Sequence, residues 1–195
     1  MMLAAREVGL RDGGVVLLRS PEEADVERLL GYLDRVRQET DNLLFSPLDP
    51  LPSVEEERQW VRRSLEGPRS LTVVAERGDE LVACCGVEGF DNVRRAHVVN
   101  LGISVLAAWR GLGLGRVLME TLIDWCRAHD EVTVVQLGAL ADNLRACGLY
   151  RSLGFVDEGR RVRAYCRETT GYVDELLMSL WVGEGVGASA GVGSE

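Results

Sequence analysis

The chain contains no lysine, and it has no apolar run long enough to span a membrane. Its 22 basic residues, all arginines, are outnumbered by 31 acidic ones, which gives a net charge of −9. An acidic chain is a poor general binder of nucleic acid, because such binders need a basic surface. Charged residues interrupt each apolar stretch before the roughly 20 residues that a spanning helix requires. We therefore expect neither a nucleic-acid partner nor a membrane partner.

Metal-binding side chains are also scarce. The five cysteines form no CxxC pair and no Cys/His cluster of the kind that binds zinc, and there are only two histidines. The first residues carry charges and no apolar core typical of a secretory signal. We expect reduced, mostly buried thiols in a cytoplasmic protein that holds no metal.

The length of 195 residues and a hydrophobic fraction of 46% are typical of one globular domain. Residues 183–195, GEGVGASAGVGSE, have no apolar period, and we expect a flexible tail there. Residues 1–14 are weakly patterned. The domain is therefore expected to cover residues 15–182.

Apolar periodicity predicts a mixed α/β fold. Two Ser-x-x-Glu capping boxes, at Ser20 and Ser53, indicate helix starts, and further helices are expected over residues 114–129 and 143–153. Strands are expected at residues 15–19, 71–75, 81–87, 96–105, 132–137, 155–165 and 172–182. Three strands in series and a closing hairpin predict a mostly antiparallel, mixed sheet of about seven strands, with helices on both faces in three layers.

A glycine loop, RGLGLGR at residues 110–116, lies between the longest central strand and the clearest helix. Glycines there allow a tight turn that directs several N–H groups to one point at a helix N-terminus, where an anion binds. Arg110 and Arg116 add charge for phosphate oxygens. The loop lacks the lysine of a P-loop, and Arg116 stands where a dinucleotide fingerprint needs its third glycine. A diphosphate site is indicated; a glycine-rich helix start without a ligand is the alternative.

Two signatures together resemble the GCN5-related N-acetyltransferase (GNAT) superfamily. Arg110-x-x-Gly113-x-Gly115 is similar to its acyl-CoA loop, and the stretches DNLRA (142–146) and LYRSLGF (149–155) are similar to its second signature. The resemblance runs from about Val15 to Val182. It implies the acyl-CoA N-acyltransferase fold, with a sheet that splays beside the long strand. Residues 94–103 and 171–178 resemble the L-amino-acid N-acyltransferase branch, near phosphinothricin-type acetyltransferases.

The resemblance implies acetyl transfer from acetyl-CoA to a primary amine, and it implies roles for particular residues. Tyr150 would protonate the leaving thiolate, although its spacing also suits a core aromatic. Asn143 would bond the CoA arm, and it also suits a helix N-cap. The backbone N–H near Val105 would bind the oxyanion. The pantetheine arm would pair with Ile103, Ser104 and Val105, and the diphosphate would lie on Arg110, Gly111, Leu112, Gly113, Leu114, Gly115 and Arg116.

The base and the acceptor are less well specified. Glu88, at a strand end, is the candidate base, with His97 and Asn100 on the next strand; the alternative for Glu88 is a solvated charge. The loop 39–45, Trp60, Tyr165 and Tyr172 are candidates for the acceptor wall. The predicted acceptor is a small-molecule amine, such as an amino acid, and the enzyme is a monomer or homodimer. Two alternatives remain: acetylation of a protein N-terminus or lysine, and a non-catalytic acyl-CoA sensor.

Overall fold

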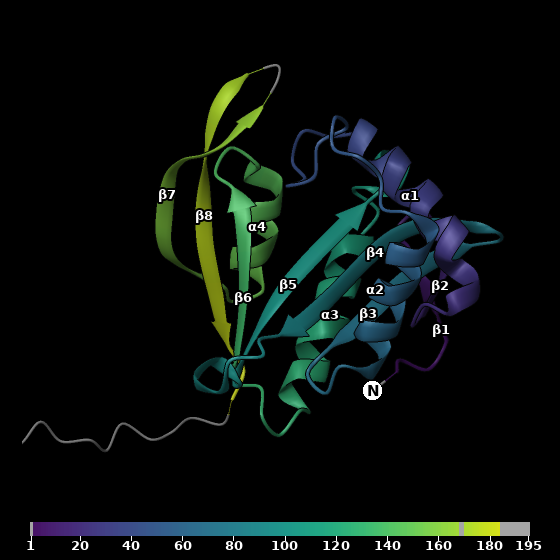
Figure 1. Ribbon diagram of the computed structural model, residues 1–195, viewed down its shortest axis with the longest axis horizontal. Helices are drawn as coiled ribbons and strands as arrows, with labels where there is room; N and C mark the ends of the chain where they lie inside the picture. Colours follow the sequence, from purple (N-terminus) through teal and green to yellow (C-terminus); the bar gives the residue numbers. More distant parts are fainter. Residues whose placement is uncertain (1, 168–169, 184–195) are drawn as a thin grey trace, which may run out of the picture.

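One open sheet of eight strands, in the order β1-β2-β3-β4-β5-β6-β8-β7, runs through the molecule (Figure 1). The computed structural model describes residues 2–167 and 170–183. Neighbouring strands pair antiparallel except β5 and β6, which are parallel. The strands are β1 (Arg6–Gly9), β2 (Val15–Arg19), β3 (Leu71–Arg77), β4 (Glu80–Gly89), β5 (Val98–Val105), β6 (Val134–Leu140), β7 (Val156–Arg167) and β8 (Gly171–Trp181). The predicted mixed, mostly antiparallel sheet is confirmed.

The strand count differs from the prediction of about seven because of β1. This four-residue strand pairs with β2 at the edge of the sheet, and three of its four residues are exposed. A short edge strand buries no complete face and so carries no apolar alternation in its sequence. Pairing with β2, and not local pattern, therefore gives residues 6–9 their extended conformation.

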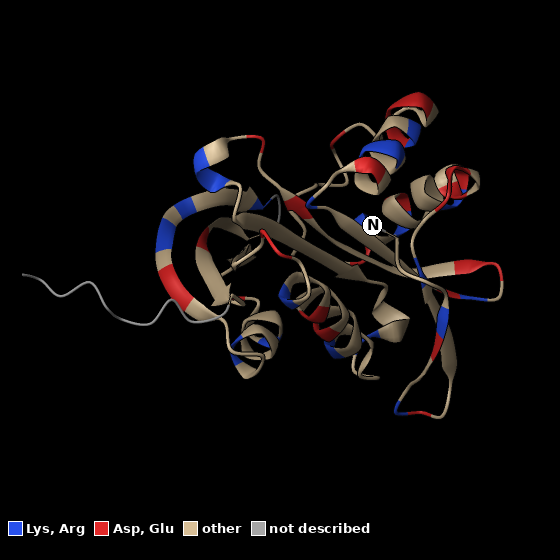
Figure 2. Ribbon diagram, turned by 90° about the horizontal axis from the view of Figure 1, so that it is seen from below, with Lys and Arg blue, Asp and Glu red and all other residues tan. Residues whose placement is uncertain are grey.

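Helices cover both faces of the sheet, as expected (Figures 1 and 2). The helices α1 (Val26–Gln38) and α2 (Val54–Glu66) cover one face, and α3 (Leu114–Arg127) and α4 (Leu144–Ser152) cover the other. Successive side chains of a strand point to opposite faces: Val73 and Ala75 belong to the large core under α3 and α4, while Val74 belongs to a smaller core under α1 and α2. Short 3-10 turns lie at η1 (Glu23–Asp25), η2 (Val93–Arg95) and η3 (Ala107–Trp109).

The two predicted capping boxes have different outcomes. At α2 the Ser53 hydroxyl accepts the Glu56 N–H at 3.3 Å, and the Glu56 carboxylate accepts the Ser53 N–H at 2.7 Å. At the first site the cap is Glu22, whose N–H donates to Asp25 at 2.8 Å, so the prediction of Ser20 was wrong. The Ser20 hydroxyl instead accepts the N–H of Leu3 at 2.9 Å, a contact between segments 17 residues apart.

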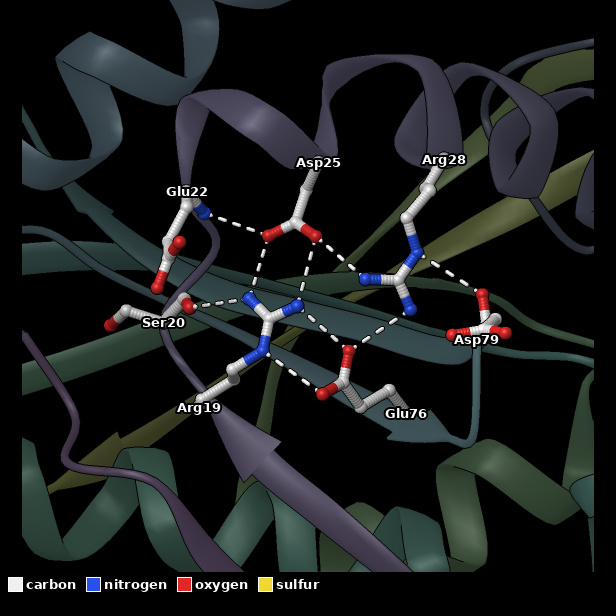
Figure 3. A network of polar contacts seen from close by, with 7 residues as sticks. All are labelled: Arg19, Ser20, Glu22, Asp25, Arg28, Glu76 and Asp79. Atoms are coloured by element: carbon white, nitrogen blue, oxygen red, sulfur yellow. Dashed lines mark hydrogen bonds and ion pairs between the residues drawn. The ribbon is translucent and has the colours of Figure 1, made fainter.

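A nearly buried ion network fixes the N-terminus of α1 against the sheet (Figure 3). Arg19 on β2 donates to Asp25 at 2.6 and 2.9 Å and to Glu76 on β3 at 2.7 and 3.2 Å; Arg28 donates to the same two carboxylates. Hydrogen bonds from Arg19 hold the pKa of Glu76 below its ordinary value. Removing one partner would leave an uncompensated charge, which is costly in a dry environment. The network thus sets the position of α1 over the sheet.

No helix in the described ranges is both long and apolar enough to cross a membrane. The predicted tail lies outside the described residues from residue 184 onward, and the domain limits 15–182 stay a prediction.

Candidate active site

The parallel strands β5 and β6 are paired only along the first part of β5 and then separate. They pair only through Val98–Asn100 and Val134–Gln136, after which Figure 1 shows them diverging. On its other side β5 stays paired with β4 as far as Val105. The second half of β5 therefore has an open edge inside the sheet, which is the predicted splay.

The direction of the main chain shows which groups line that edge. The N–H of Leu106 donates to Val82 on the β4 side at 3.0 Å, whereas the carbonyl of His97 accepts from Thr133 and Val134 on the β6 side. Because these directions alternate along a strand, the N–H and C=O groups of Leu101, Ile103 and Val105 face the gap. An extended chain with amide groups can bond to such an edge as an added strand does.

The predicted set Ile103, Ser104 and Val105 divides accordingly. Ile103 and Val105 direct main-chain groups into the gap, and the carbonyl of Val105 accepts from Arg110 Nε at 2.8 Å. The main chain of Ser104 faces β4, and its hydroxyl lies 2.8 Å from the hydroxyl of Tyr32, a buried residue of α1. The side chain of Ser104 thus lies on the face of the sheet that α1 and α2 cover, and its main-chain groups do not face the gap.

The glycine loop connects the end of β5 to α3. Gly111 (φ +85°) and Gly113 (φ +94°) adopt left-handed conformations that favour glycine, and Gly113 is the N-cap of α3. In this loop the N–H of Arg110 donates to Ala107 at 3.2 Å and that of Arg116 donates to Gly113 at 3.1 Å, and the N–H groups between them have no partner among the described residues. The N–H groups from Gly111 to Gly115 are therefore available to an anion at the helix N-terminus.

Four arginines lie in or beside this loop: Arg110, Arg116, Arg11 and Arg145. The last two were not predicted as ligands from the sequence. Arg116 donates to Ser152 at 2.7 Å. The side chain of Arg11 lies 3.6 Å from where a Cβ of Gly113 would be, and that of Arg145 lies 3.3 Å from the same position at Gly111. Neither Arg11 nor Arg145 makes an ion pair in the described part of the chain. Arg145 could have been found from its place beside Asn143; Arg11 gave no signal, since it lies a hundred residues upstream.

The residues of the second signature lie on α4, which follows β6 across the gap. Asn143 is the N-cap of α4, where its Oδ1 accepts the Ala146 N–H at 3.2 Å, and its amide nitrogen has no hydrogen-bond partner among the described residues. Tyr150 is 8% exposed and packs 6.0 Å from the ring of Phe155. Burial raises the pKa of Tyr150 to about 12. Its hydroxyl, which has no hydrogen-bond partner among the described residues, therefore keeps its proton at neutral pH.

A cavity of about 340 Å³ lies on the other face, between α2 and strands β3 to β5. Gly86 and Gly102 are direct cross-strand partners under it, and a Cβ on Gly102 would meet nothing within 4 Å. Of the predicted wall residues Leu43 and Trp60 line it, whereas Tyr165 and Tyr172 are not part of its lining. The described lining is Leu43, Trp60, Arg63, Ser64, Ser70, Thr72, Cys84, Cys85, Gly86, Val87, Glu88, Asn100, Gly102, Ile103 and Ser104.

Glu88 lies where this cavity meets a second one. It is the cross-strand partner of Asn100, the last residue of β5 that is paired with β6. Both residues also line a more polar cavity of about 710 Å³, which extends over β6 and β8. His97 precedes β5 and lines neither cavity. The structure thus places Glu88 next to Asn100, the point where β5 and β6 separate, which we call the apex of the gap. His97 lies outside both cavities.

The model of the acetyltransferase (GNAT) family matches residues 34–155, more than half of the chain. The chain belongs to the GNAT family. An L-amino acid N-acetyltransferase, AaaT of Escherichia coli K12, is 28% identical over 130 residues, 67% of this chain and 78% of the relative. The N-alpha-acetyltransferase RimI of Mycobacterium tuberculosis H37Rv is 33% identical over 127 residues, 65% of this chain and 75% of the relative.

Solved structures agree with this assignment. A GNAT acetyltransferase from Streptococcus pneumoniae superposes with a TM-score of 0.81 at 26% identity, covering 85% of this chain and 99% of that one. The GNAT chain described here is therefore an acyl-CoA-dependent N-acetyltransferase. The free loop N–H groups, the arginines around them and the open β5 edge suit a CoA thioester, which combines phosphates with an extended amide chain. No cluster of three or more metal-binding side chains occurs in the described ranges.

Proposed function

We propose that this GNAT enzyme transfers an acetyl group from acetyl-CoA to the primary amine of a small molecule, with amino acids and amino-acid-like compounds as the acceptor class. The observation that carries the proposal is the position of the apex of the gap. The apex connects the open β5 edge to the cavity under α2, which Glu88 lines. The relative named an L-amino acid N-acetyltransferase supports this acceptor class.

Acetyl-CoA supplies the acyl group and a thiol leaving group. The N–H groups of residues 111–115 and the side chain of Arg116 would hold the diphosphate, and the amide of Asn143 would bond the pantetheine arm. Main-chain groups of Val105 and Ile103 would pair with that arm along the gap. Because the diphosphate loop follows the C-terminal end of β5, the acetyl end of the pantetheine arm would point back along β5 toward Asn100. Val105 and Leu101, which both face the gap, are about 13 Å apart along this strand. We therefore place the N–H that binds the developing oxyanion at Ile103 or Leu101, nearer the apex than the expected position near Val105.

Proton transfer would use groups on the two sides of the sheet. The acceptor amine attacks only in its neutral form, and the Glu88 carboxylate at the apex would accept its proton, directly or through water. Tyr150, protonated at neutral pH, would donate to the departing sulfur. A cytoplasmic location and the choice between monomer and homodimer remain predictions from the sequence.

The test is thiol release from acetyl-CoA across a panel of amines, with mass spectrometry of the products. We expect turnover with small primary amines and little with peptides that present a free N-terminus or lysine. The RimI relative keeps the peptide alternative open, and turnover restricted to peptides would establish it. Calorimetric binding of acetyl-CoA without turnover on any amine would establish the sensor instead.

A further inference from the structure

We propose that Arg63 makes the cavity under α2 selective for amines that carry a free carboxylate, so that free apolar amino acids are preferred over peptide N-termini. This proposal rests on the proposed function and specifies its acceptor. The cavity contains two charged side chains among its described lining, Arg63 and Glu88, and the other lining residues are apolar or neutral. Both charged residues are exposed and therefore lie where the cavity opens to solvent.

Arg63 differs from its neighbours on the same helix. Arg58 forms an ion pair with Glu55 at 2.6 Å, and Arg62 forms one with Glu23 at 2.8 Å. Arg63 makes neither an ion pair nor a side-chain hydrogen bond in the described part of the chain. With Trp60 and Ser64, at the spacing of one helix face, it faces the cavity. A guanidinium without a partner is a ready site for a carboxylate, which it binds through two parallel N–H donors.

The two charges match the two ends of a zwitterion. Glu88 at the apex suits the ammonium group that must lose a proton, and Arg63 on α2 suits a carboxylate. The α-carbonyl of a peptide N-terminus is a neutral amide, which would leave Arg63 without its partner. Between the charges, Leu43, Trp60 and the glycine pair leave an apolar space, which suits an apolar side chain. The volume of about 340 Å³ is within the range of small-molecule sites, about 300–1,000 Å³.

The experiment compares acceptors with and without the carboxylate at equal concentrations of neutral amine, because conversion of the acid to the amide also lowers the pKa of the α-amine. These are leucine, methionine and phenylalanine against leucinamide, methioninamide and phenylalaninamide, assayed by kcat/KM at saturating acetyl-CoA. We expect the wild-type enzyme to prefer the free acid by about 3- to 5-fold in the pair that reacts best, because an ion pair exposed to solvent contributes about that much. Arg63→Gln should remove the preference by lowering the rate with the acid while leaving the rate with the amide. Arg63→Lys should restore part of it.

Arg62→Gln is the matched control, because it removes an arginine one position away that is paired on the surface. It should leave the preference unchanged. An amide that reacts as well as its acid, or an Arg63→Gln variant that loses both substrates equally, would overturn the proposal while leaving acetyl transfer intact. Calorimetry of the same pairs on CoA-loaded protein measures the preference without turnover. Equal binding of acid and amide there would also overturn the proposal, whereas failure of the proposed function would appear only as absent turnover.

Discussion

At the scale of single residues, the acid and the base that we propose, Tyr150 and Glu88, lie on opposite faces of the sheet. Tyr150 belongs to the large core under α3 and α4, and Glu88 lines the cavity under α2. The gap between β5 and β6 connects the two faces of the sheet. Burial of the Tyr150 phenol raises its pKa to about 12, so it holds its proton, whereas the Glu88 side chain is exposed to solvent. The environments therefore fit the opposite roles of acid and base.

Replacing Tyr150 with Phe should lower kcat by at least about 10-fold, within the usual 10²–10⁴-fold contribution of general acid catalysis or below it where water substitutes. The ring and its packing on Phe155 are retained, so the melting temperature and the affinity for CoA should change little. Because burial raises the pKa of Tyr150 to about 12, the wild-type rate should show no loss from Tyr150 ionisation up to about pH 10. Rate assays from pH 6 to 10 on both proteins test this. An unaltered kcat in the variant, with chemistry limiting, would remove Tyr150 from the mechanism.

Replacing Gly102 with Val should block the acceptor and spare the co-substrate. A Cβ there meets nothing within 4 Å and would point into the cavity under α2. A β-branched residue also suits a strand. We expect KM for the acceptor to rise at least about 10-fold, with the CoA dissociation constant and the melting temperature nearly unchanged.

The cross-strand partner Gly86 provides a contrast for this test. A Cβ on Gly86 would lie 2.9 Å from the carbonyl oxygen of Leu71, so Gly86→Val should lower the melting temperature. Gly102→Val with an unchanged KM for every acceptor would show that the amine binds elsewhere.

At the scale of elements, the gap is held at its wide end by Arg167, the last residue of β7. Its guanidinium donates to the carbonyl of Asp41 at 3.0 Å and to Asn42 at 2.9 Å in the α1–α2 loop. It also donates to Asp142 at 2.5 and 2.9 Å, between β6 and α4. The arginine therefore joins segments from the two sides of the gap.

Arg167→Ala should loosen this connection without unfolding the sheet, because the connection lies at its periphery. We expect faster amide hydrogen exchange in residues 40–45 and 141–146, and a several-fold higher KM for both substrates with a smaller change in kcat. The ion pair that Arg151 makes with Asp157 is at the surface, so Arg151→Ala serves as a control. Unchanged exchange in both segments of the Arg167 variant would contradict a connecting role.

An element could be predicted from the sequence where its signal is local and could not where tertiary contacts determine it. The α3 helix and the Ser53 cap were predictable because their signals are local. The cap at Ser20 failed because its hydroxyl serves Leu3, and β1 and Arg11 were missed because tertiary pairing alone places them. The glycine loop could be identified from its motif, whereas Arg63 could not, since only three-dimensional packing shows that it has no ion-pair partner within residues 2–167 and 170–183.

At the scale of the whole molecule, positive charge comes from arginine alone, and Figure 2 shows these residues distributed over helices, strands and loops. Guanidinium groups keep their protons at any working pH and are not nucleophiles. Most are already paired with carboxylates in the described chain, such as Arg19 with Asp25 and Glu76. An enzyme that acetylates amines thus presents no side-chain amine of its own.

Incubation with acetyl-CoA should therefore leave the protein with at most one stable acetyl group, at the α-amine of the chain. Lysine-containing proteins accumulate several under mildly alkaline conditions, because a fraction of their amines is neutral there. Intact-mass spectrometry tests the expectation, with a lysine-containing protein of similar size as the control. Hydroxylamine treatment before measurement removes any thioester on the exposed Cys166. The melting temperature should also be unchanged, since no charge of the ion-pair network is neutralised. A stable acetyl group at an internal residue would contradict this, and its position would identify a nucleophile that the arginine-only composition does not predict.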